Sequence, residues 1–147
     1  MDPVAPRALR ILVVDDHELF RAGLRQLLDR IDSLTVVGEA ADGAGALLAV
    51  EQLAPDVVLM DIGMPGTDGI EATRILVARH PGVAVVMLTA DDNDDSVAAA
   101  VRAGARGYLV KGAGLNDVRR AVTAAGRGGT PSGPETGAAA RRSGPGG

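Results

Sequence analysis

Four short apolar runs in this sequence lead directly into side chains that could bind a metal ion or a phosphate. In chain order these side chains are Asp15 and Asp16, Asp61, Thr89 and Lys111. Lys111 is the only lysine in the chain. Carboxylates gathered with one ammonium group suit a site that holds a divalent cation and a phosphoryl group. The sequence therefore indicates phosphoryl chemistry, provided that the fold brings the ends of the runs together.

The spacing of the apolar runs predicts an α/β domain with a parallel sheet. The runs are short, rich in β-branched residues and separated by segments long enough for one helix, which is typical of strands buried on both faces. The expected strands are residues 10–14, 34–39, 57–61, 85–89 and 107–110, and the expected helices are residues 18–30, 44–53, 69–79, one that ends at Gly104, and 115–125. The carboxyl ends of such strands lie at one edge of the sheet, where open α/β sheets bind their ligands.

Composition is that of a folded globular protein and excludes several kinds of site. The 147 residues, of which 46% are hydrophobic, suffice for one domain with a core. The chain has no cysteine, so disulfides, thiolate metal sites and cysteine nucleophiles are excluded. The formal net charge is −4, and the arginines, Arg21 and Arg25 among them, are scattered. This pattern predicts solvated helix surfaces and no direct binding of nucleic acid.

Changes in character along the chain predict its domain organisation. Residues 1–8 form a Pro-containing leader that is too short and polar for a signal peptide. Residues 9–127 carry the alternating strand and helix pattern. Residues 128–147 are dominated by Gly, Pro, Ala and Ser without hydrophobic periodicity, which predicts a disordered tail or a linker. No run approaches the roughly 18 apolar residues of a membrane span. We therefore expect a cytoplasmic protein without membrane contact.

Several segments around the strand ends carry a resemblance to a known family. Over roughly residues 8–127 the sequence resembles the receiver domain of the response regulators of two-component systems. It is most similar to the subfamily with a LuxR-type helix-turn-helix output domain, and no helix-turn-helix follows residue 127. The segments that carry the resemblance are VVDDHELFRAGLRQLL, LMDIGMPGTDGIEA, VVMLTA and RAGARGYLVKGA.

The resemblance implies a flavodoxin-like (βα)5 fold with the strand order 2-1-3-4-5 and a site at the point where that order reverses. Asp61 would be the phosphoacceptor, which takes a phosphoryl group from a histidine kinase. Mg²⁺ would be the cofactor, held by Asp15, Asp16 and Asp61 and by the backbone carbonyl of Gly63. Lys111 would pair with the phosphoryl group as a point charge.

The same resemblance implies a switch that reports phosphorylation to other proteins. Thr89 would hydrogen-bond a phosphoryl oxygen and draw its loop toward the site, and Tyr108 would then turn inward. The contact surface would be formed by the fourth helix, the fifth strand and the fifth helix. The chain would be a phosphoprotein of a phosphorelay in transcription regulation. It would not be an enzyme beyond its own phosphorylation and dephosphorylation, and phosphorylation is expected to favour a homodimer.

Other polar residues near these motifs have structural interpretations. His17 follows two acidic residues at a helix start, so we expect it to be solvated or to cap the helix. Asp68 fits a helix N-cap and Gly69 a tight turn. The acidic run at residues 91–95 is expected to be a solvated cap rather than a second metal site. Without a metal, repulsion among the three clustered carboxylates should raise the pKa of at least one of them.

Departures from the family pattern leave alternatives to be weighed. Lys111 is followed by Gly112 where many receivers have proline, so the loop should have more freedom. An aspartyl-nucleophile phosphatase of the haloacid-dehalogenase type would need a second aspartate where Gly63 stands. A dinucleotide-binding domain would need a glycine-rich turn after the first strand, and the sequence there is DDHELF. A phosphate-independent interaction module stays open. So does the choice between a stand-alone receiver and the N-terminal piece of a transcription factor.

Overall fold

Strands and helices alternate along the chain in the order that the sequence predicts. The computed structural model describes residues 7–64, 69–90 and 94–127. The strands are β1 (Leu9–Val14), β2 (Leu34–Ala40), β3 (Val57–Asp61), β4 (Ala84–Thr89) and β5 (Gly107–Val110). The helices are α1 (Glu18–Asp29), α2 (Gly43–Leu53), α3 (Gly69–Arg79), α4 (Asp94–Ala103) and α5 (Leu115–Gly126). Where these bounds differ from the expected ranges, they differ by one residue.

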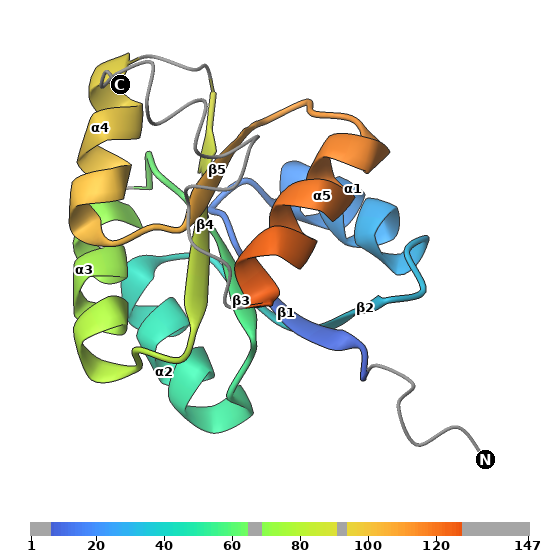
Figure 1. Ribbon diagram of the computed structural model, residues 1–147, viewed down its shortest axis with the longest axis horizontal. Coiled ribbons are helices and arrows are strands. Elements are labelled where there is room, and N and C mark those ends of the chain that lie inside the picture. The colour runs from blue at the N-terminus through green and yellow to red at the C-terminus, as the bar shows by residue number, and fades with distance from the viewer. Residues whose placement is uncertain (1–6, 65–68, 91–93, 128–147) are drawn as a thin grey trace.

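The strands form one parallel sheet in the order β2-β1-β3-β4-β5. Helices α1 and α5 cover one face, and α2, α3 and α4 cover the other (Figure 1). This arrangement follows from crossover connections of one hand between parallel strands. The chain leaves β1 toward β2 and then returns to place β3 on the other side of β1, so the order reverses there. The predicted flavodoxin-like (βα)5 fold and its strand order are confirmed.

Each face of the sheet packs its own apolar core because the side chains of a strand alternate in direction. In β1, Ile11 and Val13 lie in the core under α1 and α5, whereas Leu12 and Val14 lie in the core under α2, α3 and α4. All four side chains are fully buried. Strands β3 and β4 are likewise buried along their whole length. Burial on both faces explains the continuous apolar runs and makes the sheet a rigid base for the residues that follow each strand.

Backbone hydrogen bonds hold the carboxyl ends of neighbouring strands in line. The N–H of Asp15, just after β1, donates to the carbonyl of Ala40 at the end of β2, at 3.1 Å. The N–H of Lys111, just after β5, donates to the carbonyl of Thr89 at the end of β4, at 2.7 Å. The ladder therefore extends past the strands to the first residues of the loops. Side chains at these positions have fixed starting points.

Residues in the left-handed region end two of the helices. Gly104 follows α4 with a φ of 109°, as predicted for a glycine that terminates a helix. Helix α2 ends at Leu53, as predicted, and Ala54, the residue before Pro55, takes a φ of 49°. Left-handed backbone costs a non-glycine residue roughly 1–2 kcal/mol. Pro55 accounts for this end of the helix, because a proline disfavours right-handed helical backbone at the residue before it.

The helices are short. The longest, α1 and α5, have 12 residues each. Within the described residues, none of the helices has both the length and the apolar character that crossing a membrane requires.

Candidate functional site

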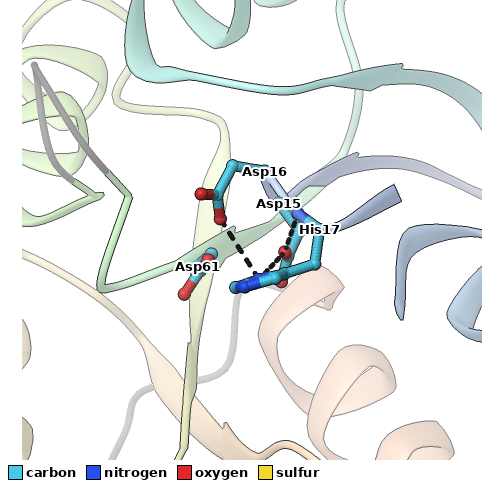
Figure 2. Close-up of side chains that lie close together, drawn as sticks. All are labelled: Asp15, Asp16, His17 and Asp61. Atoms are coloured by element: carbon cyan, nitrogen blue, oxygen red, sulfur yellow. Dashed lines mark hydrogen bonds and ion pairs between the residues drawn. The ribbon is translucent and has the colours of Figure 1, made fainter. Parts of the chain in front are cut away.

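Three carboxylates meet at the carboxyl end of the sheet. Asp15 and Asp16 directly follow β1, and Asp61 is the last residue of β3, which is paired with β1. Together with His17 each offers one ligand atom, and these atoms all lie within 4.8 Å of one another (Figure 2). The sequence predicted this convergence for the three aspartates. Carboxylate oxygens at such separations suit a hard divalent cation such as Mg²⁺.

Lys111 reaches the same cluster from the end of β5. Its Nζ lies 2.8 Å from Oδ2 of Asp15 and 3.3 Å from Oδ2 of Asp61. Asp15 is fully buried, and apart from this ion pair its Oδ2 makes no hydrogen bond to the residues that the structure describes. Burial lowers the pKa of Lys111, but hydrogen bonding to Asp15 and attraction by both carboxylates outweigh burial and raise that pKa. Lys111 therefore remains protonated and positively charged in the site.

Asp61 is held in a setting that opposes its ionisation when no cation is bound. Burial raises the pKa of Asp61, and the charge of Asp15 raises it further. The N–H of Gly63, which donates to Oδ1 of Asp61 at 3.1 Å, and the ammonium of Lys111 lower that pKa without cancelling the rise. The expectation that one carboxylate of the cluster has a raised pKa is confirmed, although burial contributes more than repulsion does.

Thr89 lies on β4, which pairs with β3, and Tyr108 lies on β5, which pairs with β4. Thr89 is the last residue of β4, one position beyond the partner of Asp61 in the ladder, and its side chain is buried. In the register of β4 and β5, Thr89 is paired with Val110 and Met87 with Tyr108. Residues two apart along a strand share a face, so Thr89 and Tyr108 point to the same side of the sheet. Tyr108 is half-buried there, against the core under α2, α3 and α4.

The site combines an acidic cluster at the switch point of the sheet with a lysine after the fifth strand. This combination can be compared with the sites of known protein families. The response regulator receiver domain family matches residues 11–123. The chain belongs to this family. The identity predicted from the sequence motifs is confirmed, and the position of the cluster follows the rule for ligand sites in doubly wound sheets.

Relatives of this receiver are similar in sequence and in structure. It is 49% identical over 114 residues to the response regulator GacA of Pseudomonas protegens, a match covering 78% of this chain and 54% of GacA. The chain thus spans about half the length of that curated relative. The signal receiver domain of NarL from Mycobacterium tuberculosis matches with a TM-score of 0.79 and 36% identity, over 84% of this chain and 99% of that one. A LuxR-family response regulator from Aurantimonas matches with a TM-score of 0.79 and 34% identity, over 84% of this chain and 88% of that one.

His17 lies at the solvent edge of the receiver's carboxylate cluster. It occupies the N-cap position of α1, but its side chain makes no capping hydrogen bond, so of the two predicted alternatives the solvated one holds. Its Nδ1 lies 3.2 Å from Oδ1 of Asp15 and 3.3 Å from Oδ1 of Asp16 (Figure 2). The side chain is 68% exposed, as the solvated interpretation expected. The Nδ1 atom of His17 therefore faces the two carboxylates and does not cap the helix.

Arg21 contacts the site, although the sequence pattern placed it on a solvated helix surface. Its Nη1 donates to the backbone carbonyl of Asp15 at 2.6 Å, and its Nε donates to Oε1 of Glu39 at 2.8 Å. The prediction is wrong for Arg21 because Glu39, near the end of β2, lies beside α1 and holds the guanidinium against the sheet. One signal was available. Arg21 is four residues after His17, and residues at that spacing share a helix face.

Phe20 is a second residue whose part in the receiver site was missed. Nζ of Lys111 lies 4.8 Å from the centroid of the Phe20 ring. A cation over an aromatic face at this distance is attracted to it. Phe20 thus limits the positions that the lysine ammonium can take. The contact joins α1 to the loop after β5, and neither segment signals it in the sequence.

Gly69 fixes the distance between α3 and the end of β3. A Cβ at this position would lie 2.0 Å from the backbone carbonyl oxygen of Asp61, so only glycine fits. The predicted role of Gly69 in a turn is thereby specified as a close approach to the backbone of Asp61. Asp68, expected to cap the helix, and residues 91–93 of the acidic run lie outside the described residues.

Proposed function

We propose that this receiver accepts a phosphoryl group from the phosphohistidine of a histidine kinase on Asp61. The observation that carries the proposal is the meeting of three carboxylates and the chain's single lysine at one end of the sheet. An oxygen of the Asp61 carboxylate attacks phosphorus, a P–O bond forms, and the P–N bond to the kinase imidazole breaks. The electron pair of the broken bond stays on the imidazole nitrogen. The product is an acyl phosphate.

The donors at the site fit Mg²⁺. The residues that would hold it are Asp15, Asp16, Asp61 and the backbone carbonyl of Gly63. The chemistry that Mg²⁺ supplies when bound is neutralisation of the negative charge that spreads over the transferring phosphoryl oxygens. Oδ2 of Asp15 supports this assignment, because among the described residues its partner is Lys111, whose ammonium can be replaced by the cation. Cations of this kind need only one or two carboxylates together with phosphate oxygens and water.

Lys111 and Thr89 act on the phosphoryl group once it is attached. The ammonium of Lys111 turns from Asp15 and Asp61 to a phosphoryl oxygen, and the Thr89 hydroxyl hydrogen-bonds another. Tyr108 shares its face of the sheet with Thr89 and turns inward as the loop after β4 closes. The contact surface that changes is formed by α4, β5 and α5. A groove of about 430 Å³ over β5 and α5, which Tyr108, Asp117 and Arg120 help to line, supports this location.

The partners of this receiver follow from the same proposal. The exchange takes place in the cytoplasm, where the kinase presents its phosphohistidine. Residues 9–127 form the receiver, and residues 128–147 form a tail or a linker to an output domain in transcription regulation, as the greater length of GacA suggests.

The receiver removes its own phosphoryl group by hydrolysis. Phosphorylation favours a homodimer, and sedimentation that shows a monomer with and without a phosphoryl mimic would contradict that part.

Phosphorus NMR of the chain with Mg²⁺ and acetyl phosphate tests the proposed chemistry. We expect an acyl-phosphate signal that needs Mg²⁺ and does not form in the presence of EDTA. A phosphohistidine signal instead would move the acceptor to an imidazole, with His17 as the nearest. Absence of any protein-bound phosphorus, with this donor and with a phosphorylated kinase, would leave a phosphate-independent interaction module.

A further inference from the structure

Arg21 joins three segments that meet at the acidic cluster. It lies in the first turn of α1, and its side chain is only 18% exposed. Its Nη1 donates to the carbonyl oxygen of Asp15, in the loop after β1, at 2.6 Å. Its Nε donates to Oε1 of Glu39, on β2, at 2.8 Å. A planar guanidinium held at two points has little freedom left.

The bond from Arg21 completes the restraint of Asp15. The N–H of Asp15 donates to Ala40 on β2, and its Oδ1 accepts the N–H of His17 at 2.7 Å. The carbonyl oxygen is the remaining polar group of the Asp15 backbone, and it accepts the hydrogen bond from Arg21. The peptide from Asp15 to Asp16 is planar, so the direction of that carbonyl sets where the backbone of Asp16 begins. The contact therefore governs where the exposed carboxylate of Asp16 can reach.

Glu39 keeps the guanidinium in place. Its Oε2 accepts from Nη1 of Arg25 at 2.6 Å, so one carboxylate bridges two arginines on α1. Hydrogen bonds from Arg25 and Arg21 lower the pKa of Glu39, which therefore stays ionised. Arg25 is more exposed than Arg21, with 44% of its side chain accessible. Two arginines thus share one carboxylate, but only the contact of Arg21 extends to Asp15.

We propose that Arg21 is a positioning residue, which aims Asp16 at the cation by holding the peptide between Asp15 and Asp16. The inference rests on the proposed function, because it assigns a role toward the same Mg²⁺. Arg21 touches neither the cation nor the phosphoryl group. Its effect passes through a backbone carbonyl, as expected of outer partners that orient metal ligands.

The test compares Mg²⁺ affinity in Arg21→Gln and Arg25→Gln, followed by amide NMR of the cluster. Each variant removes one positive charge and one ion pair to Glu39, so Arg25→Gln is a matched control. We expect Arg21→Gln to weaken Mg²⁺ binding roughly tenfold, in the range known for such outer partners. Arg25→Gln should change it by less than about twofold, because a half-exposed ion pair contributes little. Phosphorylation by acetyl phosphate should recover in Arg21→Gln at saturating Mg²⁺.

Arg21→Lys separates positioning from folding. One ammonium cannot reproduce both bonds of the guanidinium, so this variant should recover part of the lost affinity at an unchanged melting temperature. Equal losses of affinity in the Arg21 and Arg25 variants would overturn the inference, since charge alone would then account for them. Wild-type affinity in Arg21→Gln and Arg21→Lys would overturn it as well. If the wild-type chain itself neither binds Mg²⁺ nor takes up phosphorus, the proposed function fails instead.

Discussion

As long as no cation is bound, the surroundings of Asp61 favour its protonated form over its ionised form. Burial and the charge of Asp15 raise its pKa above the ordinary 3.8. A carboxylate with a raised pKa in the folded state contributes full stability below its unfolded pKa and loses that contribution as the pH rises through the folded value. We therefore expect Asp61→Asn to raise the melting temperature at pH 7 without Mg²⁺. The gain should vanish below about pH 3.8, where both states are protonated.

Thermal unfolding of both proteins across this pH range, with and without Mg²⁺, is the measurement. Mg²⁺ should stabilise the wild type more than Asp61→Asn, because we propose that it binds the folded state through that carboxylate. A lower melting temperature for Asp61→Asn at pH 7 would show that the bond to Lys111 outweighs burial.

Lys111, for which we propose a role in phosphoryl transfer, also balances buried negative charge. Its side chain is 19% exposed, and its partner Asp15 is not exposed at all. Removing one partner of a buried pair leaves the other charge uncompensated. We expect Lys111→Met to lower the free energy of unfolding by about 3 kcal/mol in denaturant titrations without metal. Lys111→Arg, which keeps the charge, should lose much less. Equal losses would show that the shape of the lysine matters more than its charge.

Helix α1 and strand β2 are joined through Glu39 and its two arginines, and this link depends on pH. Because the pKa of Glu39 is lowered in the folded state, its stabilising contribution is complete above the ordinary pKa of 4.5. It is lost as the pH falls through the lower folded value. Glu39→Gln should therefore reduce the free energy of unfolding at pH 7, by about 1 kcal/mol for partly exposed pairs.

The difference between wild type and Glu39→Gln should shrink below about pH 4.5, and urea titrations at a series of pH values would show it. Glu51→Gln, on the exposed surface of α2, is the control and should show no such trend. A difference that stays constant with pH would mean that packing, rather than charge, joins the two segments.

Helix α3 begins in contact with the end of β3, and Gly69 makes this contact feasible. A Cβ there would lie 2.0 Å from the carbonyl oxygen of Asp61, so Gly69→Ala must displace backbone. We expect a loss of about 2–3 kcal/mol in unfolding free energy, the upper range for overpacking. The amide NMR signal of Asp61 should shift as well. Gly82→Ala, where a Cβ meets nothing within 4 Å, is the control. Equal effects of both substitutions would exclude the close contact as the cause.

At the scale of the whole molecule, the sequence predicted those features of the fold and the site that the apolar runs determine. Burial on both faces makes a parallel strand visible as a continuous run, and the residue after each run must then lie at the common edge. Asp15, Asp61 and Lys111 were located in this way. The family resemblance supplied the strand order, and with it the place of the site between β1 and β3.

The side-chain contacts between neighbouring segments could not be predicted from the sequence. Arg21 reaches Asp15 only because Glu39 on β2 is beside α1, and Phe20 meets Lys111 only because α1 is next to the loop after β5. Such contacts depend on how a helix is rotated against the sheet. Hydrophobic periodicity indicates which face of α1 is buried but not which polar side chain at its border finds a partner.

The direct test of Asp61 as the phosphoacceptor is the intact mass of the chain after incubation with Mg²⁺ and acetyl phosphate, for the wild type and for Asp61→Asn. We expect the wild type to gain the mass of one phosphoryl group and Asp61→Asn to gain none. A phosphoryl group that still attaches to Asp61→Asn would place the nucleophile elsewhere and contradict the central assignment.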